Sequence, residues 1–253
     1  MLQASVVIIA KNEAHIIGKT LKSLSGLTDD IVVCDTGSAD NTIEVVKAAG
    51  CRAEQISWSG FGNTKNNALE LAKYEWVLFL DADEAIDDEL KNYLLKLDLE
   101  DRSVVYKIRF KNYFGNQLIR HGEWARECKT KLFSRNYTKW NNSEIHETVI
   151  TPAGGKERIL RGYIIHQLID NIKEYAEKMN RYAELVAQKY YRDGRKAGFF
   201  KLYIYPSFRF LVNYFIRLSF LDGRLGFITS YFSSYYAFLK YHRLKELTVS
   251  GRQ

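Results

Sequence analysis

Apolar and polar positions repeat with two different periods along the first hundred residues. Short runs with strand character occupy residues 5–10, 31–34, 52–58 and 76–80. Between them, apolar residues recur every three or four positions, which predicts helices over residues 13–25, 40–49, 64–73 and 90–97. Because repeated strand–helix units form a mostly parallel sheet with helices on both faces, we expect an α/β, Rossmann-like fold.

The hydrophobic pattern changes from residue 103 onward. Apolar residues alternate with polar or charged ones over residues 104–111, which predicts a half-exposed strand. Further short strands are predicted over residues 131–133, 148–150 and 159–166. We interpret them as an antiparallel extension of the same sheet, so the first domain is expected to cover residues 1–168.

Residues 169–253 are predicted to form amphipathic helices. Residues 172–192 carry one apolar stripe at helical spacing. Residues 199–241 are rich in aromatic side chains, but their longest uncharged run, residues 225–239, has only 15 residues. Since a membrane span needs about 20 apolar residues, we expect helices that lie on a membrane surface. The alternative is a helical hairpin that packs on the first domain or joins two copies in a homodimer.

Charge is distributed unevenly between these two regions. Residues 171–253 contain 15 Lys and Arg against 6 Asp and Glu, whereas residues 1–170 have a net charge of −2. A basic, aromatic region indicates an anionic membrane surface or nucleic acid as a partner. Nucleic acid is the weaker of the two, because the region has no recognisable reader motif.

Cysteine usage and the amino terminus indicate a cytoplasmic protein. The three cysteines show no metal-binding spacing and are an odd number, which favours reduced thiols over disulfides. The chain begins almost directly with a strand and has no basic leader before an apolar run, so we expect no signal peptide.

The strongest chemical signal lies at residues 76–84, WVLFLDADE. A buried apolar run ends abruptly in Asp81, Asp83 and Glu84. Carboxylates at the carboxyl end of a buried parallel strand lie where ligands bind in open α/β sheets. The spacing of Asp81 and Asp83 suits a hard divalent cation that carries phosphates. The alternative is that this is a strand end followed by a helix that Asp87 caps.

Three further loops should meet that one at the same edge of the sheet. The first follows the first strand, the second follows the second strand, and the third leads into the third helix. Their sequences are AKNE, DTGSAD and GNTKN. The motifs IIAKNE, VVCDTGSADNT, GNTKNNAL and FLDADE, in this order and spacing, resemble glycosyltransferase family 2 with the GT-A fold. The resemblance covers residues 5–84.

The resemblance implies a site for a nucleotide-sugar donor. Lys11, Asn12 and Glu13 would line the nucleotide pocket, with Glu13 near the ribose. Asp35 would accept a hydrogen bond from the base, the uracil N–H of a UDP-sugar. Many family members have a second carboxylate where this chain has Thr36, which leaves the base contact to Asp35 alone. The ordinary alternative is that Asp35 shapes a turn.

The resemblance also implies how the diphosphate is held. Lys65 would lie against the base or the diphosphate, and Asp81 would contact the ribose or the metal. Asp83 would hold the Mn²⁺ or Mg²⁺ that bridges the diphosphate. A late histidine often completes this metal site in GT-A enzymes, and His166 ends the last predicted strand. A histidine at a strand end can equally be structural.

Glycosyl transfer with inversion needs a carboxylate base that removes the proton of the acceptor hydroxyl. Glu144 and Glu147 lie close together in the segment SEIHE. In an extended segment they would point to opposite faces, so one of them faces the pocket. We favour Glu147, because its His-Glu pair resembles the lipopolysaccharide-core branch of the family, and Glu144 is the alternative.

The carboxyl-terminal half resembles the WaaE-like lipopolysaccharide inner-core glucosyltransferases. The resemblance rests on His166, the Asn-Arg-Tyr of residues 180–182 and the aromatic, basic run of residues 209–241. It implies transfer of glucose from UDP-glucose to a lipid-linked acceptor at the cytoplasmic face of the inner membrane. Two alternatives remain: a soluble enzyme that glycosylates a protein or a small acceptor, and a non-catalytic subunit that binds nucleotide-sugars.

Overall fold

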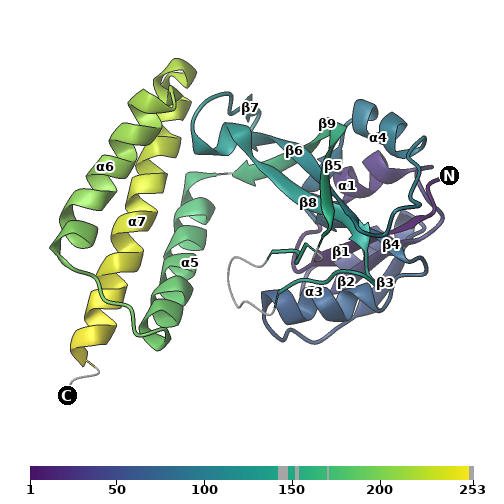
Figure 1. Ribbon diagram of the computed structural model, residues 1–253, viewed down its shortest axis with the longest axis horizontal. Helices are drawn as coiled ribbons and strands as arrows, with labels where there is room; N and C mark the ends of the chain where they lie inside the picture. Colours follow the sequence, from purple (N-terminus) through teal and green to yellow (C-terminus); the bar gives the residue numbers. More distant parts are fainter. Residues whose placement is uncertain (142–147, 152–153, 170, 251–253) are drawn as a thin grey trace. The chain divides into compact units, whose positions relative to one another are not determined.

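The fold was analysed in a computed structural model, which describes residues 1–141, 148–151, 154–169 and 171–250 (Figure 1). The chain divides into two compact units. Unit 1 contains residues 1–111 and 128–166, and unit 2 contains residues 112–127 and 167–253. The boundary expected after residue 168 stays a prediction, and the grouping of residues 112–127 with the helices was not expected from the sequence.

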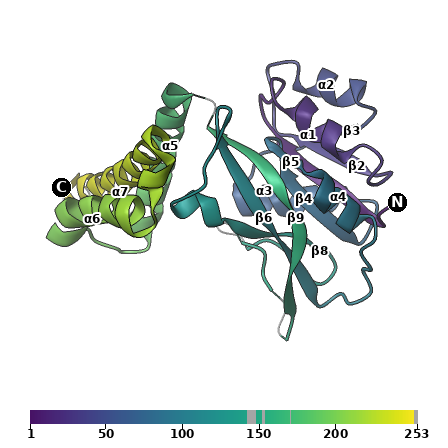
Figure 2. The ribbon, with the colours of Figure 1, turned by 90° about the horizontal axis from the view of Figure 1, so that it is seen from above.

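A single mixed sheet forms the framework of unit 1. Its order is β3-β2-β1-β4-β8-β6-β9-β5. The parallel part consists of β1 (Ala4–Ala10), β2 (Ile31–Asp35), β3 (Arg52–Gln55) and β4 (Trp76–Asp81). The other strands are β5 (Glu84–Ile86), β6 (Val104–Phe114), β8 (Cys128–Ser134) and β9 (Lys156–Ile169), and the short β7 (Gln117–Leu118) pairs with β6. β8 runs antiparallel to both β4 and β6, so the predicted antiparallel extension is confirmed (Figure 2).

Helices cover both faces of the parallel strands because side chains alternate along β1. Val6 and Ile8 belong to the same apolar cluster as α1 (Ile17–Leu24) and α4 (Asp88–Leu94). Val7 belongs to a second cluster with α3 (Phe61–Leu69). α2 (Thr42–Ala48) adds Val46 to the first cluster. The mostly parallel α/β fold expected from the sequence is therefore confirmed.

Several element boundaries differ from those expected. The first helix begins at residue 17 and not 13, because residues 11–16 form bends and turns. The third strand ends at residue 55, and the third helix covers residues 61–69 instead of 64–73. The strand expected over residues 148–150 is only an isolated bridge between Val149 and Trp140. β5 was not predicted, because three residues are too few to show a period.

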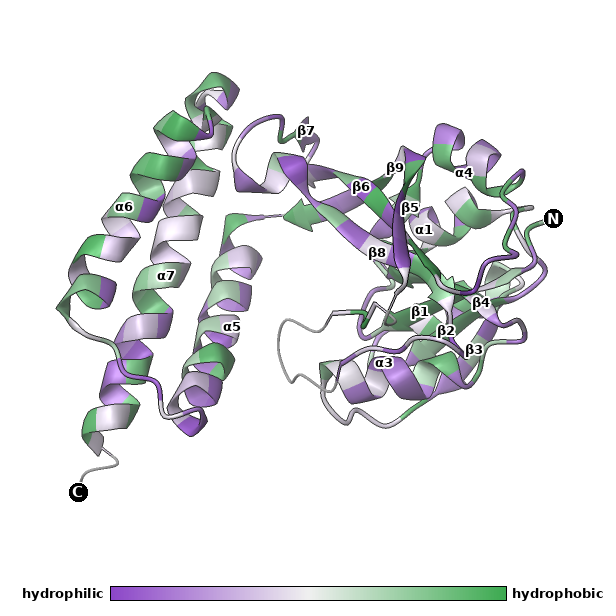
Figure 3. Cartoon of the chain, in the orientation of Figure 1, coloured by the Kyte–Doolittle hydropathy of each residue, from purple (hydrophilic) through white to green (hydrophobic). Residues whose placement is uncertain are grey.

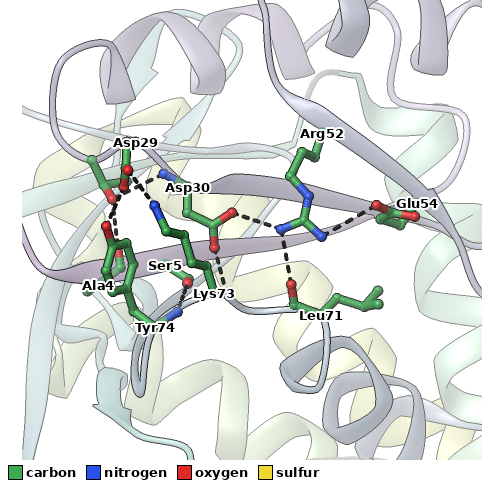
Figure 4. A network of polar contacts seen from close by, with 10 residues as sticks. Ala4, Ser5, Asp29, Asp30, Arg52, Glu54, Leu71, Lys73 and Tyr74 are labelled. Atoms are coloured by element: carbon green, nitrogen blue, oxygen red, sulfur yellow. Dashed lines mark hydrogen bonds and ion pairs between the residues drawn. The ribbon is translucent and has the colours of Figure 1, made fainter.

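Polar side chains join the loops at the amino edge of the parallel strands (Figure 4). Asp30, which is 2% exposed, accepts hydrogen bonds from the backbone N–H of Lys73 at 2.8 Å and from Arg52 at 2.9 Å. The Ser5 hydroxyl accepts the backbone N–H of Tyr74 at 2.9 Å. These contacts join the entries to β2, β3 and β4, so the opposite, carboxyl edge is left for the loops that carry the chemistry.

Unit 2 is built from helices and one connecting segment, which we call the strap. The helices are α5 (Ile172–Arg192), α6 (Tyr205–Leu211) and α7 (Arg224–Ser250), and one-turn π or 3-10 segments flank α6 at residues 200–204, 212–216 and 219–222. The strap is residues 112–127, which include a 3-10 turn at Glu123–Arg126. None of the helices described is both long and apolar enough to cross a membrane.

Close packing in unit 2 depends on small side chains. A Cβ on Gly226 of α7 would lie 1.6 Å from the backbone oxygen of Ser219.

The strap is fixed by Asp222, which accepts the backbone N–H of His121 at 2.8 Å and contacts its ring nitrogen Nδ1 at 2.6 Å. Glu123 accepts a hydrogen bond from Arg209 of α6 at 2.7 Å. Charged contacts, and not apolar ones alone, therefore join the strap to the helices.

Candidate active site

Three adjacent strands bring the predicted loops to one edge of unit 1. In the parallel ladders, Ile9 of β1 is level with both Cys34 of β2 and Asp81 of β4. Ala10 is level with Asp35. The loop after β1 therefore starts between the two carboxylates that end its neighbouring strands. The structure thus places Asp35, Asp81 and residues 11–13 together, as expected from the sequence.

Asp35 organises its own loop. It is 1% exposed, and its Oδ2 accepts the backbone N–H groups of Gly37 at 2.9 Å and Ser38 at 3.0 Å. Its Oδ1 accepts the Ser38 hydroxyl. Gly37 has a φ of +98°, a conformation that glycine adopts without strain. Both carboxylate oxygens are engaged in the turn, so the structure favours the turn-shaping alternative for Asp35, and its role toward a base stays a prediction.

The loop after β1 is held by the loop after β2. Asn12 has a φ of +58°, donates its backbone N–H to the Ser38 hydroxyl at 2.9 Å, and accepts the backbone N–H of Ala39 at 2.7 Å. The backbone N–H of Glu13 donates to the Thr42 hydroxyl at 2.9 Å. Lys11, directly before these two anchored residues, is exposed. Residues 11–13 and 35–38 therefore form one hydrogen-bonded rim. The Asn12 side chain is engaged in holding this rim together.

Two lysines flank the carboxylate of Asp81. Lys65 of α3 lies 3.6 Å from Oδ1, and Lys131 of β8 lies 3.3 Å from Oδ2. Burial opposes ionisation of Asp81, but Lys131 and Lys65 outweigh it and hold its pKa well below the usual range. Lys65 also lies over the ring of Trp140, 4.5 Å from its centre. The sequence predicted Lys65 against the base or the diphosphate and not its ion pair with Asp81, and the predicted role toward the donor stays a prediction.

Glu84 lies beneath the loop and not in it. It is 1% exposed, and its Oε2 accepts the backbone N–H of Asp81 at 3.0 Å and lies 2.5 Å from the Nζ of Lys131. Burial and the negative charge of Asp81 raise the pKa of Glu84. The loop is also held by Thr20 of α1, whose hydroxyl donates to the Ala82 carbonyl at 2.7 Å. Glu84 and Thr20 therefore fix the turn that presents Asp81 and Asp83.

Asp83 and His166 form the other half of the site. The His166 Nε2 lies 3.4 Å from the Asp83 Oδ2. The pairing of β5 with β9 sets His166 level with Glu84, which brings the histidine to the loop. The His166 ring packs edge-on against Phe110, with ring centres 5.9 Å apart. One carboxylate and one imidazole at this spacing fit a divalent cation that takes its other ligands from phosphate and water.

The protein alone offers few ligands to a cation. Among the residues described, no three acidic, histidine or cysteine side chains gather as a metal-binding group. The second Asp of the motif and His166 are therefore the donors that the site offers, while Asp81 faces two ammonium groups. A cation held this way would depend on a bound diphosphate for affinity.

Two important residues were not identified from the sequence. Lys131 had no predicted role, although a lysine beside Leu132 and Phe133 in a buried strand is an unusual arrangement that signals a buried partner. Thr20 occupies the apolar face of a helix and gave no signal of its own. The predicted bases Glu144 and Glu147 lie outside the described residues.

Several known proteins are similar to this chain over most of its length. The family description of glycosyl transferase family 2 matches residues 5–163. A lipopolysaccharide core biosynthesis glycosyltransferase of Rhizobium meliloti, LpsC, is 31% identical over 249 residues, which cover 94% of this chain and 90% of LpsC. An uncharacterized glycosyltransferase of Rickettsia prowazekii is 28% identical over 263 aligned positions, which cover all of this chain and 90% of that protein.

Solved structures with similar folds are more distant. The structure of S. aureus TarS, residues 1–349, matches with a TM-score of 0.48 and 18% identity, over 99% of this chain and 92% of that one. Glucosyl-3-phosphoglycerate synthase of Mycobacterium tuberculosis, in complex with Mn²⁺, UDP and glucosyl-3-phosphoglycerate, matches with a TM-score of 0.36 and 23% identity, over 46% and 45% of the two chains. The match to the family over most of unit 1, together with the LpsC identity over nearly the whole chain, shows that this protein is a glycosyltransferase of family 2.

Proposed function

We propose that this glycosyltransferase transfers glucose from UDP-glucose to a lipid-linked glycan of the lipopolysaccharide-core type, with a divalent cation and with inversion at the sugar carbon. The observation that carries the donor proposal is the pair of Asp83 and His166 beside an Asp81 flanked by Lys65 and Lys131. The name of the LpsC relative supports the acceptor class.

The residues around Asp81 suit a diphosphate leaving group. A cation bound by Asp83 and His166 would neutralise part of the charge that develops on the departing nucleotide. Lys65 approaches Asp81 from α3 and its ammonium is close to the place where the phosphates would lie, so it can share that task. The rim formed by residues 11–13 and 35–38 would enclose the nucleoside.

We assign the base to Glu147, with Glu144 as the alternative. The base must accept the proton of the acceptor hydroxyl, so its loss should abolish turnover and spare donor binding. Comparison of Glu147→Gln with Glu144→Gln tests the choice: each variant is titrated with UDP and assayed for transfer. If Glu144→Gln alone loses turnover, Glu144 is the base.

Donor binding is tested by calorimetric titration of the protein with UDP, GDP and CDP, in Mn²⁺ and again in EDTA. We expect uridine-selective binding that EDTA weakens by at least about tenfold, because Asp83 would hold a cation that offsets the charge of the diphosphate. Asp83→Asn should lose the metal-dependent part while its melting temperature stays close to that of the wild type. Full transfer activity in this variant would contradict the metal assignment. Equal binding of all three nucleotides would contradict a uridine donor.

Unit 2 supports binding to the inner face of the cytoplasmic membrane. Aromatic and aliphatic side chains at helical spacing stay exposed along residues 199–216: Phe200, Ile204, Phe208, Leu211 and Phe215 are each 45–56% exposed. Figure 3 shows the hydrophobic colour along α6. With the positive charge of this region, such a stripe suits an anionic bilayer surface.

The membrane proposal is tested with a charge-conserving double variant, Phe208→Ser with Phe215→Ser. Its sedimentation with vesicles that contain anionic lipid should fall relative to the wild type, while UDP binding is unchanged. Unaltered sedimentation would contradict a membrane role for this stripe. A wild-type protein that forms a dimer and does not sediment with vesicles would instead favour a soluble enzyme whose helices join two copies.

A further inference from the structure

Lys131 is a charged residue placed in the interior of unit 1. It lies on β8 next to Leu132 and Phe133, and it is only 2% exposed. Its Nζ lies 2.5 Å from Glu84 Oε2, 3.3 Å from Asp81 Oδ2 and 5.6 Å from the centre of the Phe110 ring. A buried ammonium is costly unless carboxylates pair with it, so its presence needs a reason beyond packing.

The two carboxylates that face Lys131 differ in their surroundings. Glu84 is fully buried, whereas 41% of the Asp81 side chain is exposed. Lys131 therefore extends from the core to one oxygen of the Asp81 carboxylate, and part of the Asp81 side chain is exposed at the edge of the sheet. Lys65 approaches the other oxygen of the same carboxylate at 3.6 Å. Asp81 is held from two directions, and one of them comes from inside the protein.

The Lys131 ammonium contributes to the charge balance of the loop at residues 81–84. Residues 81–84 bring three carboxylates within four positions, and a nucleotide diphosphate adds further negative charge. Like charges at such short range oppose binding, and the effect grows where solvent is excluded. A fixed ammonium beneath Asp81 offsets this charge without occupying the space that the donor needs.

We propose that Lys131 is a positioning residue for donor binding, which holds the Asp81 carboxylate toward the nucleotide and offsets its charge, with Glu84 as its buried counter-ion. This inference rests on the proposed nucleotide-sugar donor at Asp81. It separates two roles within one ion cluster: Glu84 serves the fold of the loop, and Lys131 serves both the fold and the donor.

A double variant distinguishes this role from a purely structural one. Lys131→Met alone leaves the buried Glu84 without its ammonium counter-ion and should lower the melting temperature. Adding Glu84→Gln removes that unpaired charge, so the pair Lys131→Met, Glu84→Gln should regain most of the lost stability. If Lys131 only balanced Glu84, UDP binding would return with the stability. If Lys131 positions Asp81, UDP binding stays weak in a folded protein.

The measurement is calorimetric titration with UDP in Mn²⁺, next to a thermal melt of each variant. We expect the double variant to bind UDP about tenfold to a hundredfold more weakly than the wild type, the range for loss of one charge-assisted contact. Lys131→Gln is a second probe, because its amide can still donate to Glu84 without a charge. It should bind UDP as weakly as the double variant.

The matched control is Lys107→Met with Glu157→Gln, which removes a lysine–glutamate pair of 2.6 Å at the surface of unit 1. It should bind UDP like the wild type. Wild-type affinity in the folded double variant would overturn the role of Lys131 and leave the donor proposal intact. Failure of the wild type itself to bind UDP would overturn the donor proposal, and with it the role of Lys131.

Discussion

Replacing Thr20 by valine removes one hydroxyl and keeps almost the same shape. Thr20 lies on α1, is 1% exposed, and donates to the carbonyl of Ala82 at 2.7 Å. Ala82 is itself 4% exposed and stands between the two aspartates of the site. In the valine variant this buried carbonyl loses its hydroxyl donor, and the loop loses its side-chain hydrogen bond to α1.

A buried polar group without its partner costs about 1–3 kcal/mol. For a chain of this length, each 1 kcal/mol lowers the melting temperature by about 2–4 °C, so Thr20→Val should melt roughly 2–12 °C below the wild type. Thr20→Ser is the matched control, since it keeps the hydroxyl and loses only a methyl group. Its melting temperature should fall less than that of Thr20→Val.

Both variants are followed by thermal melts and by titration with UDP in Mn²⁺. Because Ala82 separates Asp81 from Asp83, the valine variant should also bind UDP several-fold more weakly at a temperature where it is fully folded. A Thr20→Val protein with the melting temperature and UDP affinity of the wild type would refute the claim that this hydrogen bond holds the loop.

Three further expectations concern the two units. Gly162 has a φ of +85°, and a Cβ there would lie 2.2 Å from the backbone nitrogen of Leu90, so Gly162→Ala should lower the free energy of unfolding in urea by at least about 2 kcal/mol; a loss below about 0.5 kcal/mol would contradict the close approach. Burial, more than the nearby Glu54, raises the pKa of Cys34 to about 12, so a thiol reagent at pH 8 should leave Cys34 unmodified in the folded protein and label it after denaturation. Burial, more than the nearby Arg209, lowers the pKa of Lys240 from 10.5 to about 8, so the unfolded chain binds this proton more tightly between those values. The free energy of unfolding of the wild type should therefore rise relative to Lys240→Met from pH 8 to 10.5, and a constant difference would refute the shift.

Much of the parallel half of unit 1 could be predicted from the sequence, because each strand and helix carries its own period. The run at residues 76–80 is apolar throughout since β4 is covered on both faces, and the carboxylates after it mark the edge of the sheet. The neighbourhood of Lys65 and Asp81, and of Asp83 and His166, followed from the order of the motifs and the resemblance.

The parts that could not be predicted depend on contacts between distant residues. Glu84 looked like a third carboxylate of the site, but the pairing of β5 with β9 turns it inward toward Lys131. The position of Glu84 has no local signature, because it depends on which partner the fold brings near. By contrast, Asp35 bonds its own neighbours Gly37 and Ser38, so this turn was an alternative that the sequence already offered, and the role of Asp35 toward a base stays a prediction.

The position of β1 at the centre of the parallel strands restricts how this chain can change in length. β1 is paired on both sides, and successive side chains along it face opposite apolar clusters. One residue inserted there would exchange the two packed faces and displace Lys11 and Asn12 relative to both neighbours. The exposed residues 100–102, which connect α4 to β6, lie outside the paired strands and carry no such restriction. Insertions and deletions in a mutational scan should therefore accumulate in that connection and be absent from β1.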